Sequence, residues 1–87
     1  ICGSGVGVDI TANKFKNVRS AVAFNPDQAF ASRNDDNTNV LSLAADYLDE
    51  TDAKKIVSAW LATPFSGEER HLRRLRKIED LERRNLK

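Results

Sequence analysis

The 87 residues suffice for one small domain, and 14 Lys and Arg against 13 Asp and Glu leave a net charge of +1. With 40% hydrophobic residues, the composition excludes a disordered chain and is typical of an ordinary globular protein. A domain of this size buries only a modest fraction of its surface, so we expect a partner chain to contribute to its stability.

The cysteine, histidine and apolar content exclude further classes. A single cysteine cannot form an internal disulfide, and with one histidine it leaves no set of zinc ligands, so no metal site is predicted. No stretch has the apolar length of a membrane span, so we predict no membrane partner. These features favour a reducing, cytoplasmic setting.

The chain opens with ICGSGVGVDITANK, in which Cys2 ends what looks like a strand that began earlier. A glycine-rich turn then leads to a short helix predicted over Val8–Lys16. Such a turn offers backbone N–H groups and the positive end of the helix dipole to an anion. The spacing of Gly3, Gly5 and Gly7 fits neither the dinucleotide fingerprint nor the Walker pattern, so an anion site and a structural turn remain equally open. A thiolate would be stabilised there, although a cysteine that ends a strand is more often inert core.

Two apolar runs, Val18–Phe24 and Asn39–Ala44, predict strands because they are rich in small and β-branched residues. The helix between them should have Asn25 as its N-cap and Pro26 in its first position, and should end in the polar run 33–37. The residues of this helix that are predicted to face the core are Ala29 and Phe30.

Two more helices are predicted after the second strand. The first should be capped by Asp49 or Thr51 and should end before Pro64 and Gly67. Its apolar face consists of Ala53, Ile56, Val57, Trp60 and Leu61. The second should run from Glu68 to about Arg84 and carries Leu72, Leu75, Ile78 and Leu81. These apolar residues recur every three positions, fewer than the 3.6 residues of one helical turn, so the stripe winds around the helix. We therefore expect the helix to contact more than one surface, one of which would belong to a partner subunit.

Helices that alternate with continuous apolar strands predict an α/β fold, a parallel sheet in three layers with helices on both faces. Two strands are too few for such a sheet, so we expect further strands before Ile1. We predict a single domain over 1–87, in which 1–66 is the C-terminal part of the sheet domain. Residues 67–87 are predicted to form a terminal helix that packs on a partner subunit.

Four short motifs occur in order along the chain. They are a Cys-Gly-Ser-Gly loop, an Ala-Asn-Lys shortly after it, an Asn-rich turn before Asn-Val-Leu, and an Arg-His-x-x-Arg segment that opens the last helix. In these motifs the chain resembles the C-terminal half of the type B ribose-5-phosphate isomerase family, which includes the galactose-6-phosphate isomerase subunits. The resemblance covers essentially all 87 residues and implies a Rossmann-like fold.

The resemblance implies an enzyme that interconverts aldose and ketose phosphates through an enediolate, without metal or cofactor. It implies that Cys2 is the base that moves a proton between adjacent carbons and that Ser4 relays a proton between oxygens. The backbone amides around Gly3, Gly5 and Gly7 would stabilise the developing negative charge.

The same resemblance assigns residues outside the loop. Asn13 would lie close to the substrate or brace the loop. Arg70 and Arg74 would bind the phosphate of the sugar, at a site that the family places across a homodimer interface. The winding apolar stripe of the last helix agrees with such an interface.

Three acidic residues depart from the family pattern. Asp35 stands where the resemblance predicts a histidine that opens the sugar ring, and Asp36 stands where an asparagine is usual. Asp46 replaces an arginine expected just after the second strand, and the single histidine is His71, in the arginine segment. Asp35 is therefore the candidate for ring opening, and Asp36 a candidate substrate contact.

Other interpretations compete with an isomerase. A solvated face is the alternative for the basic residues, because eight of the 14 Lys and Arg fall within residues 68–87. Nucleic-acid binding is disfavoured, because no aromatic residue is interleaved with the basic run. A catalytically silent relative that binds a ligand or pairs with an active subunit is the alternative function, which the acidic replacements would permit.

Overall fold

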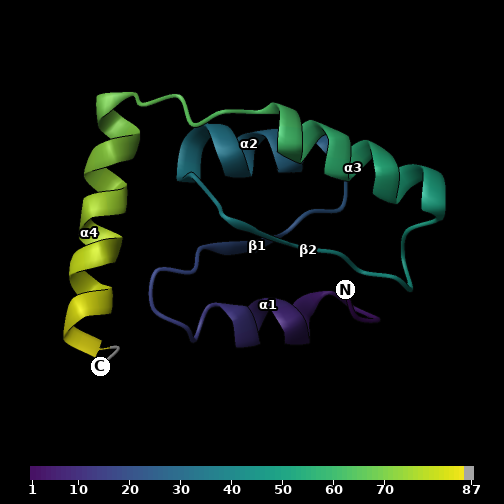
Figure 1. Cartoon of the computed structure of the whole chain (residues 1–87), viewed down its shortest axis with the longest axis horizontal. Coiled ribbons are helices and arrows are strands. Elements are labelled where there is room, and N and C mark those ends of the chain that lie inside the picture. Colours follow the sequence, from purple (N-terminus) through teal and green to yellow (C-terminus); the bar gives the residue numbers. More distant parts are fainter. Residues whose placement is uncertain (86–87) are drawn as a thin grey trace.

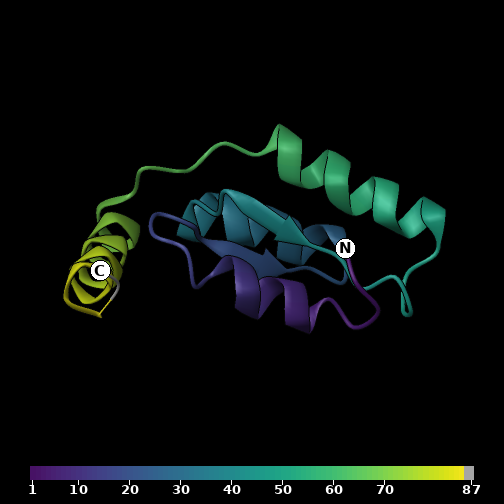
Figure 2. The same cartoon turned by 60° about the horizontal axis from the view of Figure 1, so that its bottom comes forward.

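The computed structural model of this chain describes residues 1–85, which form a three-layer α/β sandwich with a helix at one end (Figure 1). The middle layer is a parallel sheet. Helix α1 (Val6–Ala12) covers one face of it, and helices α2 (Pro26–Asp36) and α3 (Glu50–Ala62) cover the other (Figure 2). The predicted fold class is confirmed.

The sheet pairs β1 (Ser20–Val22) with β2 (Val40–Ser42) in parallel. Cys2 forms a further parallel bridge to Ala44, just beyond the last residue of β2. The Cys2 N–H donates to Leu43 O at 3.3 Å, on the edge of β2 that faces away from β1. The N-terminal residues therefore extend the sheet on the β2 side, as expected for the end of a strand.

Both strands are shorter than the apolar runs predict. At their start the Arg19 N–H donates to the side-chain oxygen of Asn39 at 2.8 Å. Just beyond β1, the Phe24 N–H donates to the side-chain oxygen of Gln28 at 2.7 Å. Side chains thus replace the regular ladder at both ends, a local arrangement that hydrophobic periodicity does not encode.

The helix starts largely follow the predicted caps. The Asn25 side chain accepts from the Gln28 N–H at 2.8 Å, and the Asp49 side chain accepts from the Asp52 N–H at 2.8 Å. Asp49, not Thr51, is therefore the cap of α3. Helix α1 begins two residues earlier than predicted and ends at Ala12.

The core lies between the sheet and the helices α2 and α3. It contains Ala23, Ala29, Leu43 and Ile56. The small side chains of Ala23, just after β1, and Ala29, in α2, let the sheet and helix α2 pack closely together. The prediction that Phe30 and Leu61 face the core is wrong, because they are 51% and 71% exposed. Each lies one position after a residue that packs inward, about 100° further around its helix.

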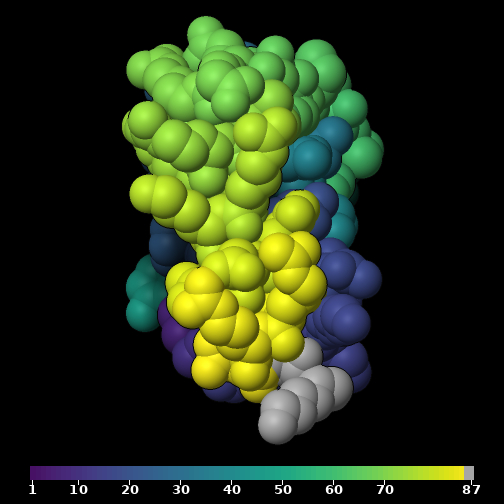
Figure 3. Space-filling view, turned by 90° about the vertical axis from the view of Figure 1, so that its left-hand side faces the viewer, coloured from purple at the N-terminus to yellow at the C-terminus, as the bar shows by residue number. Residues whose placement is uncertain are grey.

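Helix α4 (Glu69–Asn85) lies at one end of the sandwich, where it covers one side of the molecule (Figure 3). Its residues His71 and Leu75 are buried, whereas Ile78 and Leu81 are 49% and 55% exposed. A groove of about 510 Å³ separates α4 from β1. The apolar stripe thus packs only partly on the chain's own body. Among residues 1–85, no helix has both the length and the apolar character needed to cross a membrane.

Candidate active site

The glycine loop is joined to the chain that follows β2 by two backbone hydrogen bonds. The Ala45 N–H donates to Cys2 O at 2.9 Å, and the Asp46 N–H donates to Gly3 O at 2.9 Å. Gly5 has φ +77°, and a Cβ there would lie 3.1 Å from the Ala44 nitrogen. Glycine is therefore required at position 5 for backbone conformation and for close packing.

Cys2 precedes the glycine loop that leads into α1, and backbone N–H groups of this loop and of the first turn of α1 act on its thiol. Hydrogen bonding from the Val8 N–H is the largest cause of a lowered pKa for this thiol, with further contributions from the N–H groups of Gly5 and Gly7. Partial burial opposes this effect by raising the pKa, but the net shift is downward. The loop thus favours a thiolate at Cys2.

Ser4 is exposed in the glycine loop, one residue before Gly5, which is the N-cap of α1. Its Oγ accepts from the Val6 N–H at 3.2 Å, which leaves the hydroxyl hydrogen free of that bond. N–H groups at the start of α1 therefore interact with the Ser4 hydroxyl and the Cys2 thiol, an arrangement that favours negative charge there.

Gly3 and Gly7 have different surroundings. A Cβ on Gly3 would lie 2.5 Å from an Asp46 carboxylate oxygen, so Asp46 leans over the loop. A Cβ on Gly7 would meet nothing within 4 Å in the described part of the chain. Gly7 therefore has no steric reason within this chain to be glycine.

Asn13 follows α1 and binds the outer edge of β1. Its side-chain nitrogen donates to Ser20 O at 3.0 Å, and its side-chain oxygen accepts from the Ser20 N–H at 2.8 Å. Asn13 thus connects the end of α1 to the edge of β1.

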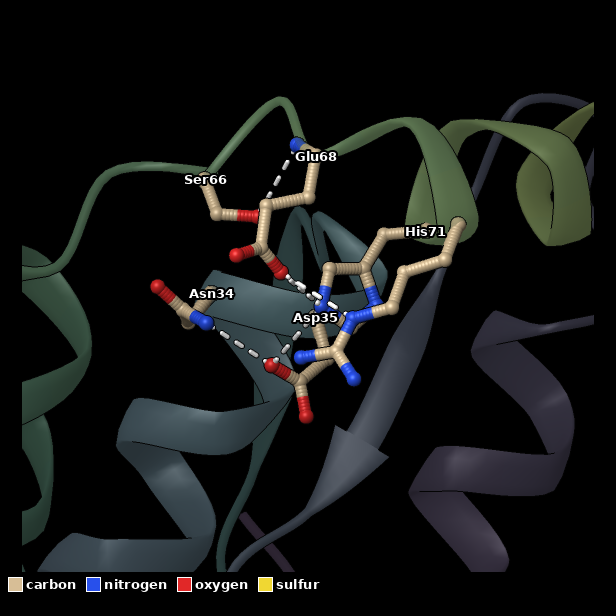
Figure 4. Close-up of polar contacts among 6 residues, drawn as sticks. Asn34, Asp35, Ser66, Glu68 and His71 are labelled. Atoms are coloured by element: carbon tan, nitrogen blue, oxygen red, sulfur yellow. Dashed lines mark hydrogen bonds and ion pairs between the residues drawn. The ribbon is translucent and has the colours of Figure 1, made fainter.

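A second polar cluster surrounds the N-terminus of α4 (Figure 4). Nε2 of His71 lies 3.0 Å from Glu68 Oε2 and 3.6 Å from Asp35 Oδ1. Nε of Arg70 donates to the same Glu68 oxygen at 3.2 Å, and the Asn34 amide donates to Asp35 Oδ1 at 2.8 Å. Asp35 and Arg70, two predicted site residues, are thus brought together around a buried histidine.

Two further predicted site residues lie on the surface near this cluster. Asp36 is exposed at the end of α2 and contributes to the groove beside α4. Arg74 is exposed on α4, one turn beyond Arg70. Asp46 lies at the glycine loop and belongs to the other group of residues.

The loop and the cluster lie at opposite ends of the sheet. Cys2 is paired beyond the carboxyl end of β2. Helix α2 runs back from the carboxyl end of β1, so Asp35, in its last turn, lies near the amino ends of the strands. In Figure 1 the N-terminus and α4 lie on opposite sides of the fold. One copy of the chain therefore does not bring Cys2 and the arginines together.

Sequence reasoning did not identify His71 and Glu68 as members of this cluster. They lie in or next to α4, whereas Asp35 belongs to α2, so only the tertiary packing of the two helices brings them together. The available signal was that the single histidine of the chain lies within the arginine motif.

A parallel α/β sandwich with a polar loop at the carboxyl end of its strands belongs to the Rossmann-like class, which binds ligands at that edge. The sequence profile described as Ribose/Galactose Isomerase matches residues 1–78. The chain belongs to that family.

Individual relatives agree with this assignment. Ribose-5-phosphate isomerase B of Escherichia coli is 42% identical over 84 residues, which are 97% of this chain and 56% of that protein. The structure of type B ribose 5-phosphate isomerase from Trypanosoma cruzi superposes with a TM-score of 0.94 at 38% identity, covering 97% of this chain and 56% of that one. Ribose-5-phosphate isomerase B from Mycoplasma genitalium, with bound ribulose-5-phosphate, has a TM-score of 0.90 at 40% identity, covering 94% and 53%. The chain spans about half the length of these relatives.

Proposed function

We propose that this protein is a sugar-phosphate isomerase that interconverts ribose 5-phosphate and ribulose 5-phosphate. The reaction moves a proton between C1 and C2 through an enediolate, which requires a base, a hydroxyl relay and donors for the oxyanion. Cys2 is the proposed base, Ser4 the relay, and the loop amides the donors. Family membership supports the substrate class. The scheme requires neither metal nor cofactor, and the free thiol suits a reducing cytoplasm.

The observation that carries this proposal is the setting of the Cys2 thiol. A carbon-proton base must be deprotonated near neutral pH, and the N–H groups of Val8, Gly5 and Gly7 lower the pKa of this thiol. In this proposal, N–H groups of the same loop would also stabilise the charge that develops on the enediolate oxygens. A thiolate and oxyanion donors are thus available within one loop.

We further propose that the complete site forms between two copies of the chain in a homodimer. The separation of Cys2 from Arg70 and Arg74 within one chain supports this arrangement, because the phosphate of a five-carbon substrate must be bound while its C1 and C2 react. In a symmetric dimer each loop would face the α4 arginines of the other subunit.

Mixing two impaired variants tests the activity and the dimer together, at a ribose 5-phosphate concentration below the wild-type KM, where the raised KM of Arg74→Ala also leaves little activity. Cys2→Ala and Arg74→Ala proteins, in the form that the gene encodes, are assayed with ribose 5-phosphate alone and after co-refolding. A shared site predicts recovery to about one quarter of wild-type activity, because half of the dimers are mixed and each has one intact site. A mixture no more active than its components would contradict the shared site, and an inactive wild type would contradict the isomerase.

A matched control uses the double variant Cys2→Ala/Arg74→Ala mixed with wild type. Neither site of such a mixed dimer is intact if the sites are shared, so activity should fall below simple dilution. If each chain holds its own site, the mixture should retain the activity of its wild-type fraction.

A catalytically silent subunit is the second candidate. It is favoured by Asp46, whose carboxylate leans over Gly3 beside the proposed oxyanion position and would oppose negative charge there. Binding of ribose 5-phosphate by calorimetry without turnover would support this alternative over the isomerase.

A further inference from the structure

His71 is the buried group to which the proposed reaction gives no role. Its side chain is only 4% exposed, and within residues 1–85 neither ring nitrogen meets a partner in hydrogen-bonding geometry. Figure 4 shows the ring between the carboxylates of Glu68 and Asp35. Burying a polar side chain without a hydrogen-bond partner costs free energy of folding. Such a residue in a folded protein therefore requires an explanation, and a functional role is one.

The carboxylates of Glu68 and Asp35 favour a proton on Nε2 of His71. Without a proton on Nε2, the ring nitrogen and the carboxylates would repel each other, because oxygens of Glu68 and Asp35 lie 3.0 Å and 3.6 Å away. A proton on Nε2 converts this repulsion into attraction. Arg70, the other charged group of the cluster, donates to the Glu68 oxygen, so Glu68 already has a cationic partner. Asp35 is thus the carboxylate available to exchange the proton.

We propose that Asp35 and His71 share one proton and together open the sugar ring. The inference rests on the proposed isomerase function and extends it. The Asp35 side chain is 42% exposed whereas His71 is buried behind it, so Asp35 reaches the substrate and His71 acts only through Asp35. The Nε2 to Oδ1 distance of 3.6 Å must shorten by about 0.7 Å for transfer, which is within the tightening that substrate binding brings.

The proposed step conserves protons and electrons. His71 gives its Nε2 proton to the Asp35 carboxylate, and Asp35 donates a proton to the ring oxygen as the bond from that oxygen to C1 breaks. The anomeric hydroxyl becomes the C1 carbonyl, and its proton passes to Asp35 and back to His71. An imidazole can both carry and release a proton, so His71 provides the proton source that the Asp35 carboxylate alone does not provide.

Two substrates separate ring opening from the later proton transfer. D-ribose 5-phosphate is mostly a closed furanose, whereas D-erythrose 4-phosphate carries its phosphate on the oxygen that would close a five-membered ring. Both are assayed on the gene-encoded protein and its His71→Gln variant. Glutamine keeps an N–H donor near the carboxylates but cannot release a proton. We expect kcat/KM to fall about 100-fold for ribose 5-phosphate and to stay within about threefold for erythrose 4-phosphate.

A rescue variant distinguishes proton storage from structural support. Asp35→His in the His71→Gln background places a titrating group directly at position 35, and should restore most of the ribose 5-phosphate activity. Retention of wild-type activity by His71→Gln would mean that only the donor matters, and would overturn the proposal. Equal losses on both substrates would also overturn it. A wild type inactive on both substrates would instead refute the isomerase on which the inference rests.

Discussion

The side chain of Asn13 pairs with the backbone of Ser20 as a neighbouring strand would. It donates to Ser20 O and accepts from Ser20 N–H, the two groups that point away from β2. An exposed strand edge invites pairing with other chains, and a side chain that occupies its polar groups prevents this. Asn13 therefore occupies the β1 edge of the sheet, whereas Cys2 pairs on the other side of β2.

Asn13→Ala should destabilise the protein by about 1–2 kcal/mol, because two hydrogen bonds are lost at once. Urea unfolding followed by circular dichroism measures the change. Lys14→Ala is the matched control, since the neighbouring lysine is exposed and its replacement should alter stability by less than about 0.5 kcal/mol. Equal effects of the two replacements would show that the pairing with Ser20 contributes little.

Gly5→Ala and Gly7→Ala should act on stability in opposite directions. An alanine at position 5 would be strained at φ +77° and would crowd Ala44, with an expected cost above about 1 kcal/mol. An alanine at position 7, inside α1 and open to solvent, should stabilise by up to about 1 kcal/mol. Thermal unfolding of both variants tests this contrast.

The activity of Gly7→Ala then reports on function. If a substrate or second subunit closely approaches this position, turnover should fall although the variant is more stable. A more stable variant with unchanged turnover would show that no substrate or second subunit approaches the Cβ position of residue 7; the backbone N–H, which alanine keeps, is not tested by this variant.

Sequence reasoning was most successful where local chemistry decides the structure. Asn25 and Pro26 predicted the start of α2 because capping involves neighbours along the chain. The exposure of Phe30 could not be predicted in this way. Whether the residue next to the buried Ala29 is also buried depends on how closely the sheet approaches the helix, which is a tertiary feature. The contact of Asp35 with His71 was equally inaccessible, because it depends on where α4 docks.

The Cys2 thiol should titrate below its ordinary pKa. Iodoacetamide labelling across pH, read by mass spectrometry, should give a midpoint lower in the native protein than in guanidinium, where the N–H groups of Val8, Gly5 and Gly7 no longer converge. Because the folded pKa is the lower one, the thiolate stabilises the fold at pH values above the unfolded pKa. This contribution is lost as pH falls through the folded pKa.

Cys2→Ala provides the comparison for that titration. The variant should lose the part of the pH dependence of stability that the thiol contributes, and should lower turnover of ribose 5-phosphate by about 100-fold or more. Identical labelling midpoints in folded and unfolded protein would contradict a stabilised thiolate. Unchanged turnover would remove Cys2 from the role of base.

Arg74→Ala should weaken binding of phosphorylated sugars selectively. A hydrogen bond between a guanidinium and a phosphate contributes about 1.5–3 kcal/mol, so its loss should raise KM for ribose 5-phosphate about 10-fold to 100-fold. KM for unphosphorylated ribose should change little, because that sugar never makes the contact.

The neighbouring Arg73 is also exposed on α4, and Arg73→Ala removes the same charge one position away. If long-range attraction by the basic helix were the only effect, the two variants would raise KM equally, and the increase would disappear in high salt. A large increase confined to Arg74→Ala and retained in salt would identify a direct phosphate contact, whereas equal increases for phosphorylated and unphosphorylated sugar would leave Arg74 as a surface residue.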